Sequence, residues 1–355
     1  MIVNLMTKSL VWMGKGDIQL LDREISHPDT GELLIQVKAC AICGSDLRIK
    51  SHGNSRVSAG RTMGHEVSGV IIELGANVKG FSIGESVAIG ADIPCGQCSY
   101  CLAGHANNCK QNLAMGYQFD GGFSRYLLVP AVVVNNGPIH KLNGKVDHSL
   151  ACLAEPLACC INGYEVAFAE FLKPKNVLIF GAGPIGLMLG KMAPFYNIDQ
   201  LTFVESNENR RQAAQKIFPK AKCFDFHQPD LLSQLADVQA EGFALIFTAC
   251  SDIATHALAL KQLAIRGVLN LFGGLPAGAA KLEIDSNFIH YREALVTGSH
   301  GSTPAQHGRA LELIQSGKVD LRDLMTHAFP LSRAVEAFAA AASGDAIKVI
   351  ITPDV

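Results

Sequence analysis

The sequence lacks the features that direct a chain to a membrane or to nucleic acid. No stretch approaches 18 uninterrupted apolar residues, and the apolar start has neither a basic region nor a small-residue cleavage site. Charged residues are only 17% of the chain, the formal net charge is −2, and no basic run is present. We therefore expect a soluble, cytoplasmic protein with small-molecule substrates, whose partners include neither nucleic acid nor a membrane.

Internal repeats and low-complexity linkers are also missing from the sequence. The sequence has enough hydrophobic residues to form a large core, because they make up 48% of its 355 residues. A chain of this length exceeds one ordinary core, so two domains are expected.

The two parts of the chain differ in their hydrophobic pattern. The first part contains short β-branched runs between Gly, Pro, Asn and Asp clusters, which is typical of an antiparallel β-rich domain. These runs are 32–39, 66–75, 85–90 and 123–134. After about residue 150, short apolar runs alternate with helical patterns, which indicates a parallel sheet covered on both faces. Those runs are "NVLIF", 201–206, 243–250 and 267–274, and a final strand, "AIKVIIT", follows a helical tail.

A local cluster of cysteines predicts a structural zinc site. The chain has 11 cysteines, and in a long chain with no signal peptide metal binding or catalysis is favoured over disulfides. Four of them, Cys95, Cys98, Cys101 and Cys109, follow the spacing C-x2-C-x2-C-x7-C. Short loops can bring four thiolates to one tetrahedral point. Four closed ligands leave no open position, so catalysis is expected elsewhere.

Two other interpretations of this lobe stay open. The first is that the four cysteines are unrelated buried residues, although that would not predict so regular a spacing in a Gly/Ser/Asn loop. An iron–sulfur cluster is the other, but its usual ligand run has a shorter last gap and a proline after it.

A second set of metal-ligand residues is dispersed along the chain. Cys43 lies in "CGSD", His65 and Glu66 lie in "GHEVSG", and Glu155 lies in "EPLACC". A catalytic site open to substrate is often assembled from separate segments in this way. A single histidine beside a strand is more often a satisfied core or surface residue, so the prediction depends on these residues occurring together.

The segment "GAGPIG" predicts a dinucleotide-binding loop. Its members are Gly181, Gly183, Pro184, Ile185 and Gly186, and it follows the apolar strand "NVLIF" and opens a helix. Backbone N–H groups and the helix N-terminus can then meet a pyrophosphate. A glycine turn without a ligand is the alternative.

The preferred dinucleotide is expected to be NAD. Glu205 closes the second strand 19 residues after Gly186, where a carboxylate would accept both ribose hydroxyls and repel a 2′-phosphate. Arg210 and Arg211 lie nearby and weaken this preference for NAD over NADP.

Together these motifs resemble those of the zinc-dependent medium-chain dehydrogenases/reductases over essentially the full length of the chain. The motifs are "CGSD", "GHEVSG", the cysteine lobe, "GGFSRYLLVP", "EPLACC" and "GAGPIG". The resemblance implies an α/β fold in which residues 1–152 and 295–355 form a GroES-like catalytic domain that contains the zinc lobe, 95–109. Residues 153–294 would form a Rossmann domain with a doubly wound parallel sheet. It also implies NAD and two Zn2+ per chain, one catalytic and one structural.

The resemblance assigns roles to individual residues. Cys43, His65 and Glu66 would hold the catalytic zinc, and Glu155 would be a nearby carboxylate able to replace Glu66 or a water. Ser45 matches the hydroxyl that relays the substrate proton. Phe119 matches a position near the substrate pocket.

Arg48 departs from the family pattern. Many relatives have a histidine five residues after the zinc cysteine, as the outer station of the proton relay. Arginine stays protonated and cannot serve in that way. Arg48 could pair with the cofactor pyrophosphate or an anionic substrate group, or it could be a solvated surface residue.

The acidic residue in "GHE" resembles the polyol branch of the family, which includes sorbitol, galactitol-phosphate and threonine dehydrogenases. It implies hydride transfer between NAD and a secondary alcohol of a polyol, free, phosphorylated or cyclic, giving a ketone. One alternative is an L-threonine 3-dehydrogenase; a remote one is a non-enzymatic dinucleotide-binding sensor. The resemblance also implies a homodimer or homotetramer, in which 267–274 could pair edge to edge across a dimer axis as the last Rossmann strand.

Overall fold

The computed structural model describes residues 5–144, 146–168, 174–276, 278 and 281–354. The chain divides into two compact units. The first unit is discontinuous: it runs to Cys159 and resumes at Gly301, and the second unit is Cys160–His300. The boundaries expected from the sequence, 152/153 and 294/295, lie a few residues before these limits. Among the described residues, every helix is too short or too polar to cross a membrane.

The first unit is built on antiparallel β-structure, as predicted. Its larger sheet has the order β10-β6-β5-β3-β18-β17, and β9 also pairs with β3. The smaller sheets are β2-β1-β4 and β7-β8. The strands are β1 (Leu5–Gly14), β2 (Asp17–Ile25), β3 (Leu33–Ala41), β4 (Arg61–Thr62), β5 (Glu66–Leu74), β6 (Ser86–Ile89), β7 (Asp92–Ile93), β8 (Leu113–Ala114), β9 (Tyr126–Val129), β10 (Ile139–Lys141), β17 (Met325–Pro330) and β18 (Lys348–Thr352).

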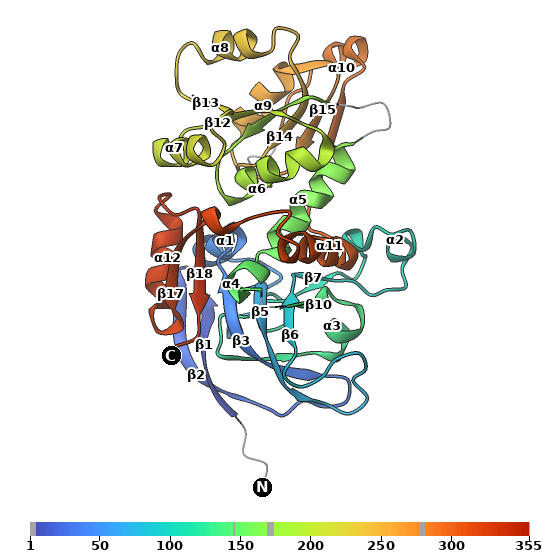
Figure 1. Ribbon diagram of the computed structural model, residues 1–355, viewed down its shortest axis with the longest axis vertical. Coiled ribbons are helices and arrows are strands. Elements are labelled where there is room, and N and C mark those ends of the chain that lie inside the picture. The colour runs from blue at the N-terminus through green and yellow to red at the C-terminus, as the bar shows by residue number, and fades with distance from the viewer. Residues whose placement is uncertain (1–4, 145, 169–173, 277, 279–280, 355) are drawn as a thin grey trace. The chain divides into compact units, whose positions relative to one another are not determined.

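The end of the chain completes this unit. In β18, Ile351 pairs with Cys40 of β3, and the pairing is antiparallel. Helix α12 (Ala334–Ala342) places Phe338 against Phe123, with ring centroids 5.5 Å apart. Figure 1 shows these red elements beside the blue strands from the start of the chain. The predicted final strand is therefore confirmed, and it lies inside the first unit's sheet.

Short helices connect the strands of the first unit. They are α1 (Gly44–His52), α2 (Ser99–Leu102), α3 (Ala131–Asn136), α4 (His148–Ala151) and α11 (Pro304–Gln315), with 3-10 turns η1 (Ala106–Asn108), η3 (Arg322–Leu324) and η4 (Leu331–Arg333). Helix α5 (Ala154–Ala167) begins in the first unit and ends in the second.

One predicted strand was wrong in part. The run 123–134 contains β9, but its valine-rich end folds as α3. Pro130 stands between the two and is the residue from which the helix starts. Because proline has no N–H to donate to a sheet ladder, it ends the strand there.

The second unit is a doubly wound parallel sheet. Its order is β13-β12-β11-β14-β15-β16, with all neighbouring pairs parallel. The strands are β11 (Asn176–Phe180), β12 (Gln200–Glu205), β13 (Lys222–Asp225), β14 (Phe243–Thr248), β15 (Leu263–Leu271) and β16 (Leu295–Gly298). The helices are α6 (Pro184–Met192), α7 (Glu208–Ile217), α8 (Leu231–Val238), α9 (Ile253–Lys261) and α10 (Ser286–Arg292), with the 3-10 turn η2 (Ala193–Tyr196).

The order of strands locates the ligand-binding edge of this sheet. Strands β11 and β14 are neighbours at the point where the strand order reverses, and ligands of such sheets bind outside the carboxyl ends at that point. The run 267–274 was expected to be an edge strand, and this was wrong. Most of it belongs to β15, which pairs with both β14 and β16, so β16 occupies the edge.

Candidate metal centres and cofactor site

The four cysteines of the lobe converge as the spacing predicts. The sulfur atoms of Cys95, Cys98, Cys101 and Cys109 all lie within 4.8 Å of one another. Cys98 precedes α2, which contains Cys101, and the turn η1 leads into Cys109. The whole set is thus assembled by local structure.

Backbone hydrogen bonds prepare these sulfurs for a cation. The N–H groups of Cys95 and Gln111 donate to Cys109 Sγ at 3.2 and 3.3 Å. Backbone N–H groups lower the pKa of Cys98 to about 6, whereas burial and the neighbouring thiols raise the pKa of Cys101 to about 12. Four thiolates so close together repel one another, and a bound divalent cation removes that cost. The donor set fits a tetrahedral zinc.

The dispersed ligands also meet. Cys43 Sγ, a ring nitrogen of His65 and a carboxylate oxygen of Glu66 lie within 4.8 Å of one another. Cys43 caps the start of α1, and Glu66 is the first residue of β5. The antiparallel pairing of β3 with β5, which joins Ala41 to Glu66, brings the two segments together.

Asp46 holds this arrangement from behind. Its Oδ2 accepts the Cys43 N–H at 2.9 Å, and its Oδ1 lies 3.5 Å from His65 Nδ1. Burial disfavours the charged imidazole, but Asp46 and Cys43 together outweigh burial and raise the pKa of His65 well above its usual value. On the other side of the ring, Ser45 Oγ lies 3.3 Å from His65 Nε2.

Glu66 is paired with a lysine that the sequence did not single out. Lys348 Nζ lies 2.6 Å from Glu66 Oε1, and the exposed fractions of the two side chains are 3% and 0%. Burial raises the pKa of Glu66, and Lys348 opposes that rise. The other carboxylate oxygen, Oε2, is buried and has no hydrogen-bond partner among the described residues. An unpartnered buried oxygen beside a thiol and an imidazole fits a metal ligand.

Glu155 lies near this centre but outside the converging set. It is 6% exposed, and burial raises its pKa to about 7; His65 lowers that pKa and Glu66 raises it. The Cys159 thiol lies 3.8 Å from Glu155 Oε1. Within the part of the chain that the structure describes, Glu155 is thus a buried carboxyl group without a fixed ionic partner.

The two predicted substrate residues occupy other surroundings. Arg48 is exposed on α1, and within the described residues no hydrogen bond or ion pair is recorded for it. Phe119 lies in the wall of a separate cavity near Asp120. The aromatic ring that faces the metal centre is Tyr117, whose centroid is 6.0 Å from that of His65. Burial raises the pKa of Tyr117, and the neighbouring His65 and Ser45 side chains oppose that rise.

The glycine loop of the second unit has the predicted strand–turn–helix form. Gly181 follows β11 with φ of 99°, and Gly183 caps α6, whose first residue is Pro184. A Cβ on Gly186 would lie 1.9 Å from the carbonyl oxygen of Gly181, so a side chain cannot fit. A glycine turn that leads directly into a helix is the arrangement in which the helix N-terminus can meet an anion.

Glu205 supports this loop directly. Its Oε2 accepts the Ala182 N–H at 2.8 Å, and its Oε1 accepts the Asn207 N–H at 2.9 Å and the Ser206 hydroxyl at 3.3 Å. Arg210 Nη1 comes to 3.5 Å from the place of a Cβ on Gly183. Glu205 and Arg210, which are predicted to contact the dinucleotide, thus both lie at the loop. Both oxygens of the Glu205 carboxylate already accept hydrogen bonds from the protein.

These features define a class of protein. A β-rich unit with two sets of zinc-type ligands, combined with a doubly wound sheet that has a glycine-rich first turn, is the architecture of a zinc-binding dehydrogenase. Residues 29–138 match the alcohol dehydrogenase GroES-like domain, and residues 184–316 match the zinc-binding dehydrogenase domain.

Individual relatives agree with this class. The chain is 32% identical to sorbitol dehydrogenase of Halalkalibacterium halodurans, covering 96% of this chain and 97% of the relative. It is 31% identical to L-threonine 3-dehydrogenase of Pyrococcus horikoshii, with 94% of each chain covered. The chain belongs to the zinc-binding medium-chain alcohol dehydrogenase family and is an oxidoreductase of that family.

Solved structures have the same fold. One from Sinorhizobium meliloti 1021, described as a zinc-binding dehydrogenase bound to NADP, superposes with a TM-score of 0.90 at 27% identity, covering 98% and 100% of the two chains. An alcohol dehydrogenase from Escherichia coli CFT073 in complex with NADH gives 0.87 at 26% identity, covering 98% and 99%. The expected GroES-like and Rossmann folds are thereby confirmed.

Three residues of the metal centre were missed at the sequence level. Asp46 stands in the quoted motif "CGSD", and Lys348 is the one charged residue in the apolar strand "AIKVIIT". A lysine inside an apolar run is a signal for a buried ion pair. Tyr117 carried no such signal.

Proposed function

We propose that the protein oxidises a secondary alcohol of a polyol to a ketone with NAD, at a zinc ion held by Cys43, His65 and Glu66. The observation that carries the proposal is the convergence of these three ligands with the unpartnered oxygen of Glu66. Cys95, Cys98, Cys101 and Cys109 would hold the second, structural zinc. When bound, zinc supplies Lewis acidity toward the alcohol, and the nicotinamide supplies a hydride acceptor.

Ser45 is the residue best placed to move the substrate proton. Its Oγ lies beside His65 Nε2, and its other neighbour is the Tyr117 hydroxyl. The two hydroxyls form a short path for a proton away from the alcohol. Arg48 cannot take part because its guanidinium does not deprotonate near neutral pH.

Lys348 and Asp46 act as positioning residues. Asp46 fixes the Cys43 backbone and lies beside the outer nitrogen of His65. Lys348 balances the Glu66 carboxylate, so a zinc ion with one thiolate and one carboxylate would retain net positive charge in this pocket. That charge favours the alcohol's ionised form over its neutral form.

Glu155 is proposed as an exchangeable carboxylate at the same centre. Its burial and its pKa of about 7 leave it able to hold or release a proton near neutral pH. It could approach the metal in place of Glu66, or accept a hydrogen bond from a substrate hydroxyl.

A polyol is favoured as the substrate class because a carboxylate-containing site suits hard oxygen donors, and a vicinal diol offers two of them. L-Threonine is the second candidate, supported by relatives that have that name at similar identity. The deciding experiment follows NADH formation with sugar alcohols, inositols, their phosphates and L-threonine. Absence of NAD reduction with every alcohol, in protein that contains two zinc ions per chain, would refute the proposal.

Arg48 is proposed to recognise an anionic group of the substrate or cofactor. It is exposed two residues after Asp46, beside the metal centre in sequence. The variant Arg48→Ala should then lose more activity with phosphorylated than with free polyols. An equal loss with both would show that Arg48 does not recognise substrate phosphate.

The dinucleotide is proposed to be NAD, supported by the Glu205 carboxylate at the end of β12. Comparing kcat/KM for NAD and NADP tests this directly. A homodimer or homotetramer is proposed as well, supported by the open edge strand β16, where Leu295 is 40% exposed. Light scattering that gives a monomer mass at micromolar concentration would reject an oligomer.

A further inference from the structure

The loop that carries Tyr117 packs directly on the segment that carries a metal ligand. A Cβ added to Gly116 would lie 3.1 Å from the backbone nitrogen of Gly64, the residue before His65. The Tyr117 ring follows Gly116, is half-buried, and has its centroid 6.0 Å from that of the His65 ring. The position of this ring is therefore part of the geometry of the metal centre.

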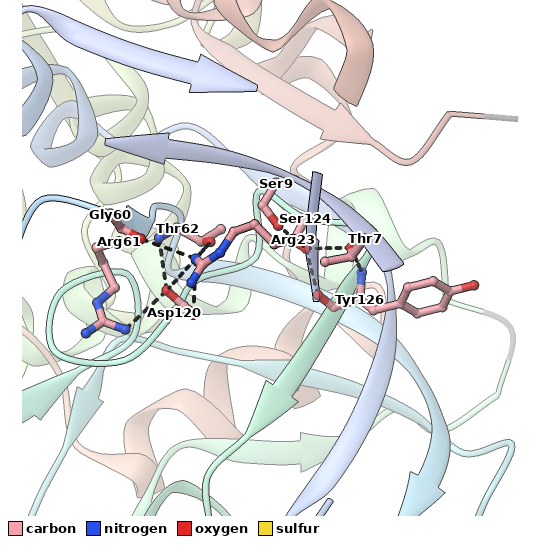
Figure 2. Close-up of polar contacts among 9 residues, drawn as sticks. All are labelled: Thr7, Ser9, Arg23, Gly60, Arg61, Thr62, Asp120, Ser124 and Tyr126. Carbon is pink, nitrogen blue, oxygen red and sulfur yellow. Dashed lines mark hydrogen bonds and ion pairs between the residues drawn. The ribbon is translucent and has the colours of Figure 1, made fainter. Parts of the chain in front are cut away.

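Asp120 fixes the far end of this loop. Its Oδ1 accepts the Thr62 N–H at 3.0 Å and a bond from Arg61 Nη1 at 3.1 Å, and both donors belong to β4. Figure 2 shows these bonds, together with the contact between Asp120 and Arg23 of β2. They join the loop to the two strands at Asp120, but they do not reach the Tyr117 side chain.

The backbone holds the middle of the loop only weakly. Three successive N–H groups, those of residues 117–119, are directed at the Ala114 carbonyl oxygen, at 3.3, 3.1 and 3.3 Å. A carbonyl oxygen has two lone pairs, so it cannot accept three strong hydrogen bonds at once. The direction of the Tyr117 ring therefore depends on side-chain contacts.

Arg56 makes such a contact. Its guanidinium carbon lies 5.5 Å from the centroid of the Tyr117 ring, which is a cation–π distance. Its Nη2 donates to the Asn112 carbonyl oxygen at 3.0 Å. The guanidinium group thus joins the ring to the segment that leads into β8.

Both attachments of the Arg56 side chain are themselves fixed. The Arg56 N–H donates to Asn54 Oδ1 at 2.9 Å, and the next residue, Val57, is buried in the core of the unit. On the other side, Asn112 Nδ2 donates to Asp92 Oδ1 at 2.7 Å. Because its two anchors are already ordered, the guanidinium group can hold the ring with little further loss of conformational entropy.

We propose that Arg56 is a positioning residue that holds the Tyr117 ring beside His65, so that the ring forms one fixed side of the substrate site. The inference rests on the proposed function, because it concerns the same metal centre. A cation–π contact at an exposed position favours the stacked arrangement by about two- to fivefold. Without Arg56, the ring would leave this position more often, and the site would be complete in fewer molecules.

The first measurement is ¹³C NMR of the zinc-loaded protein with NADH, with label at the Cζ atom of its six tyrosines. The signal that is missing from Tyr117→Leu belongs to Tyr117. Arg125→Ala is the matched control, because Arg125 is also exposed and its guanidinium carbon lies 5.4 Å from the centroid of the Tyr126 ring. Figure 2 shows that ring directed away from the hydroxyl groups near it.

Arg56→Ala should shift the Tyr117 signal. It should also lower kcat/KM by about two- to fivefold, measured with the sugar alcohol or inositol that the unaltered protein oxidises fastest. In the Tyr117→Leu background the same replacement should leave kcat/KM unchanged, because no ring is left to position. Arg125→Ala should change neither the Tyr117 signal nor kcat/KM. The thermal midpoint of each variant shows that it is folded.

The proposal is overturned if the Tyr117 signal of Arg56→Ala coincides with that of the unaltered protein. It is also overturned if Arg56→Ala lowers kcat/KM equally with and without the Tyr117 ring, because Arg56 would then act by another route. A zinc-loaded protein that oxidises no alcohol would refute the proposed function, and the NMR comparison would then decide this inference by itself.

Discussion

Lys348 Nζ lies 2.6 Å from Glu66 Oε1, with both side chains buried. The two residues are 282 positions apart in the chain, so this contact links the last strand of the first unit to its metal centre. A buried ion pair of this kind is costly to form and more costly to break, because removing one partner leaves an uncompensated charge. The ion pair with Lys348 opposes the rise that burial causes in the pKa of Glu66, and so favours the ionised carboxylate.

Replacing Lys348 by methionine should destabilise the metal-free protein more than the zinc-loaded protein. Without zinc, the Glu66 carboxylate would be left buried and unpaired, at a cost of about 3–5 kcal/mol. With zinc bound, the charge of the metal compensates the charge of the Glu66 carboxylate. Urea unfolding with and without a chelator measures both values. Lys141→Met, which breaks the exposed pair with Glu85, should cost at most about 1 kcal/mol in either state. Equal destabilisation of both states by Lys348→Met would contradict this account.

The variant Cys43→Ser should lower the zinc content from two ions to one per chain and abolish alcohol oxidation. NADH binding should persist, because the glycine loop belongs to the other unit. Metal analysis and fluorescence titration with NADH provide the measurements. Cys223→Ser changes a thiol of β13 outside both ligand sets and should keep two zinc ions. Retained turnover in Cys43→Ser would exclude this residue as a ligand of the working metal.

Gly186→Ala should weaken NADH binding by at least a hundredfold. The new Cβ would lie 1.9 Å from the Gly181 carbonyl oxygen, which forces the loop away from α6. At Gly298 an added Cβ meets only the Leu271 carbonyl oxygen, at 3.5 Å, so Gly298→Ala is a control in the same unit. Zinc content should be unchanged in both. If Gly186→Ala bound NADH normally, the loop would not be the pyrophosphate site.

His307 should make the protein less stable in acid. Its ring is buried, its Nδ1 lies 3.0 Å from His140 Nδ1, and burial lowers its pKa to about 3. The unfolded chain takes up a proton near the usual histidine pKa of about 6.5, whereas the folded chain does not. Stability from this group is therefore full above that pH and falls as the pH drops through it.

Between pH 7 and pH 5 this histidine should cost about 2 kcal/mol of unfolding free energy. Urea unfolding at the two pH values measures the change. In His307→Asn the loss of unfolding free energy between the two pH values should be smaller by that amount. This comparison separates the contribution of His307 from that of zinc release. The same pH slope in both proteins would exclude His307 as its source.

The parts of the site whose residues lie close together in the sequence could be predicted. The cysteine lobe closes within 15 residues, from Cys95 to Cys109, and the glycine loop is one strand, one turn and one helix. Their spacing alone determines their geometry. Lys348 could not be assigned in advance, because its partner depends on the pairing of β18 with β3 across the sheet.

The fold predictions failed where local pattern and tertiary context disagreed. The hairpin of β1 and β2 was not singled out, because Lys8 and the charged residues of β2 interrupt its apolar positions. The valine-rich start of α3 resembles a strand in composition, but Pro130 redirects it. The edge strand β16 has only four residues and gives almost no periodic signal.

The discontinuity of the first unit sets an order of events during synthesis. The second unit is one continuous segment, Cys160–His300, and can fold as soon as it leaves the ribosome. The ligands Cys43, His65 and Glu66 emerge long before it, yet the lysine that pairs with Glu66 follows that residue by 282 positions. A nascent chain that stops short of β18 would thus contain every ligand of the metal centre without the charge that completes it.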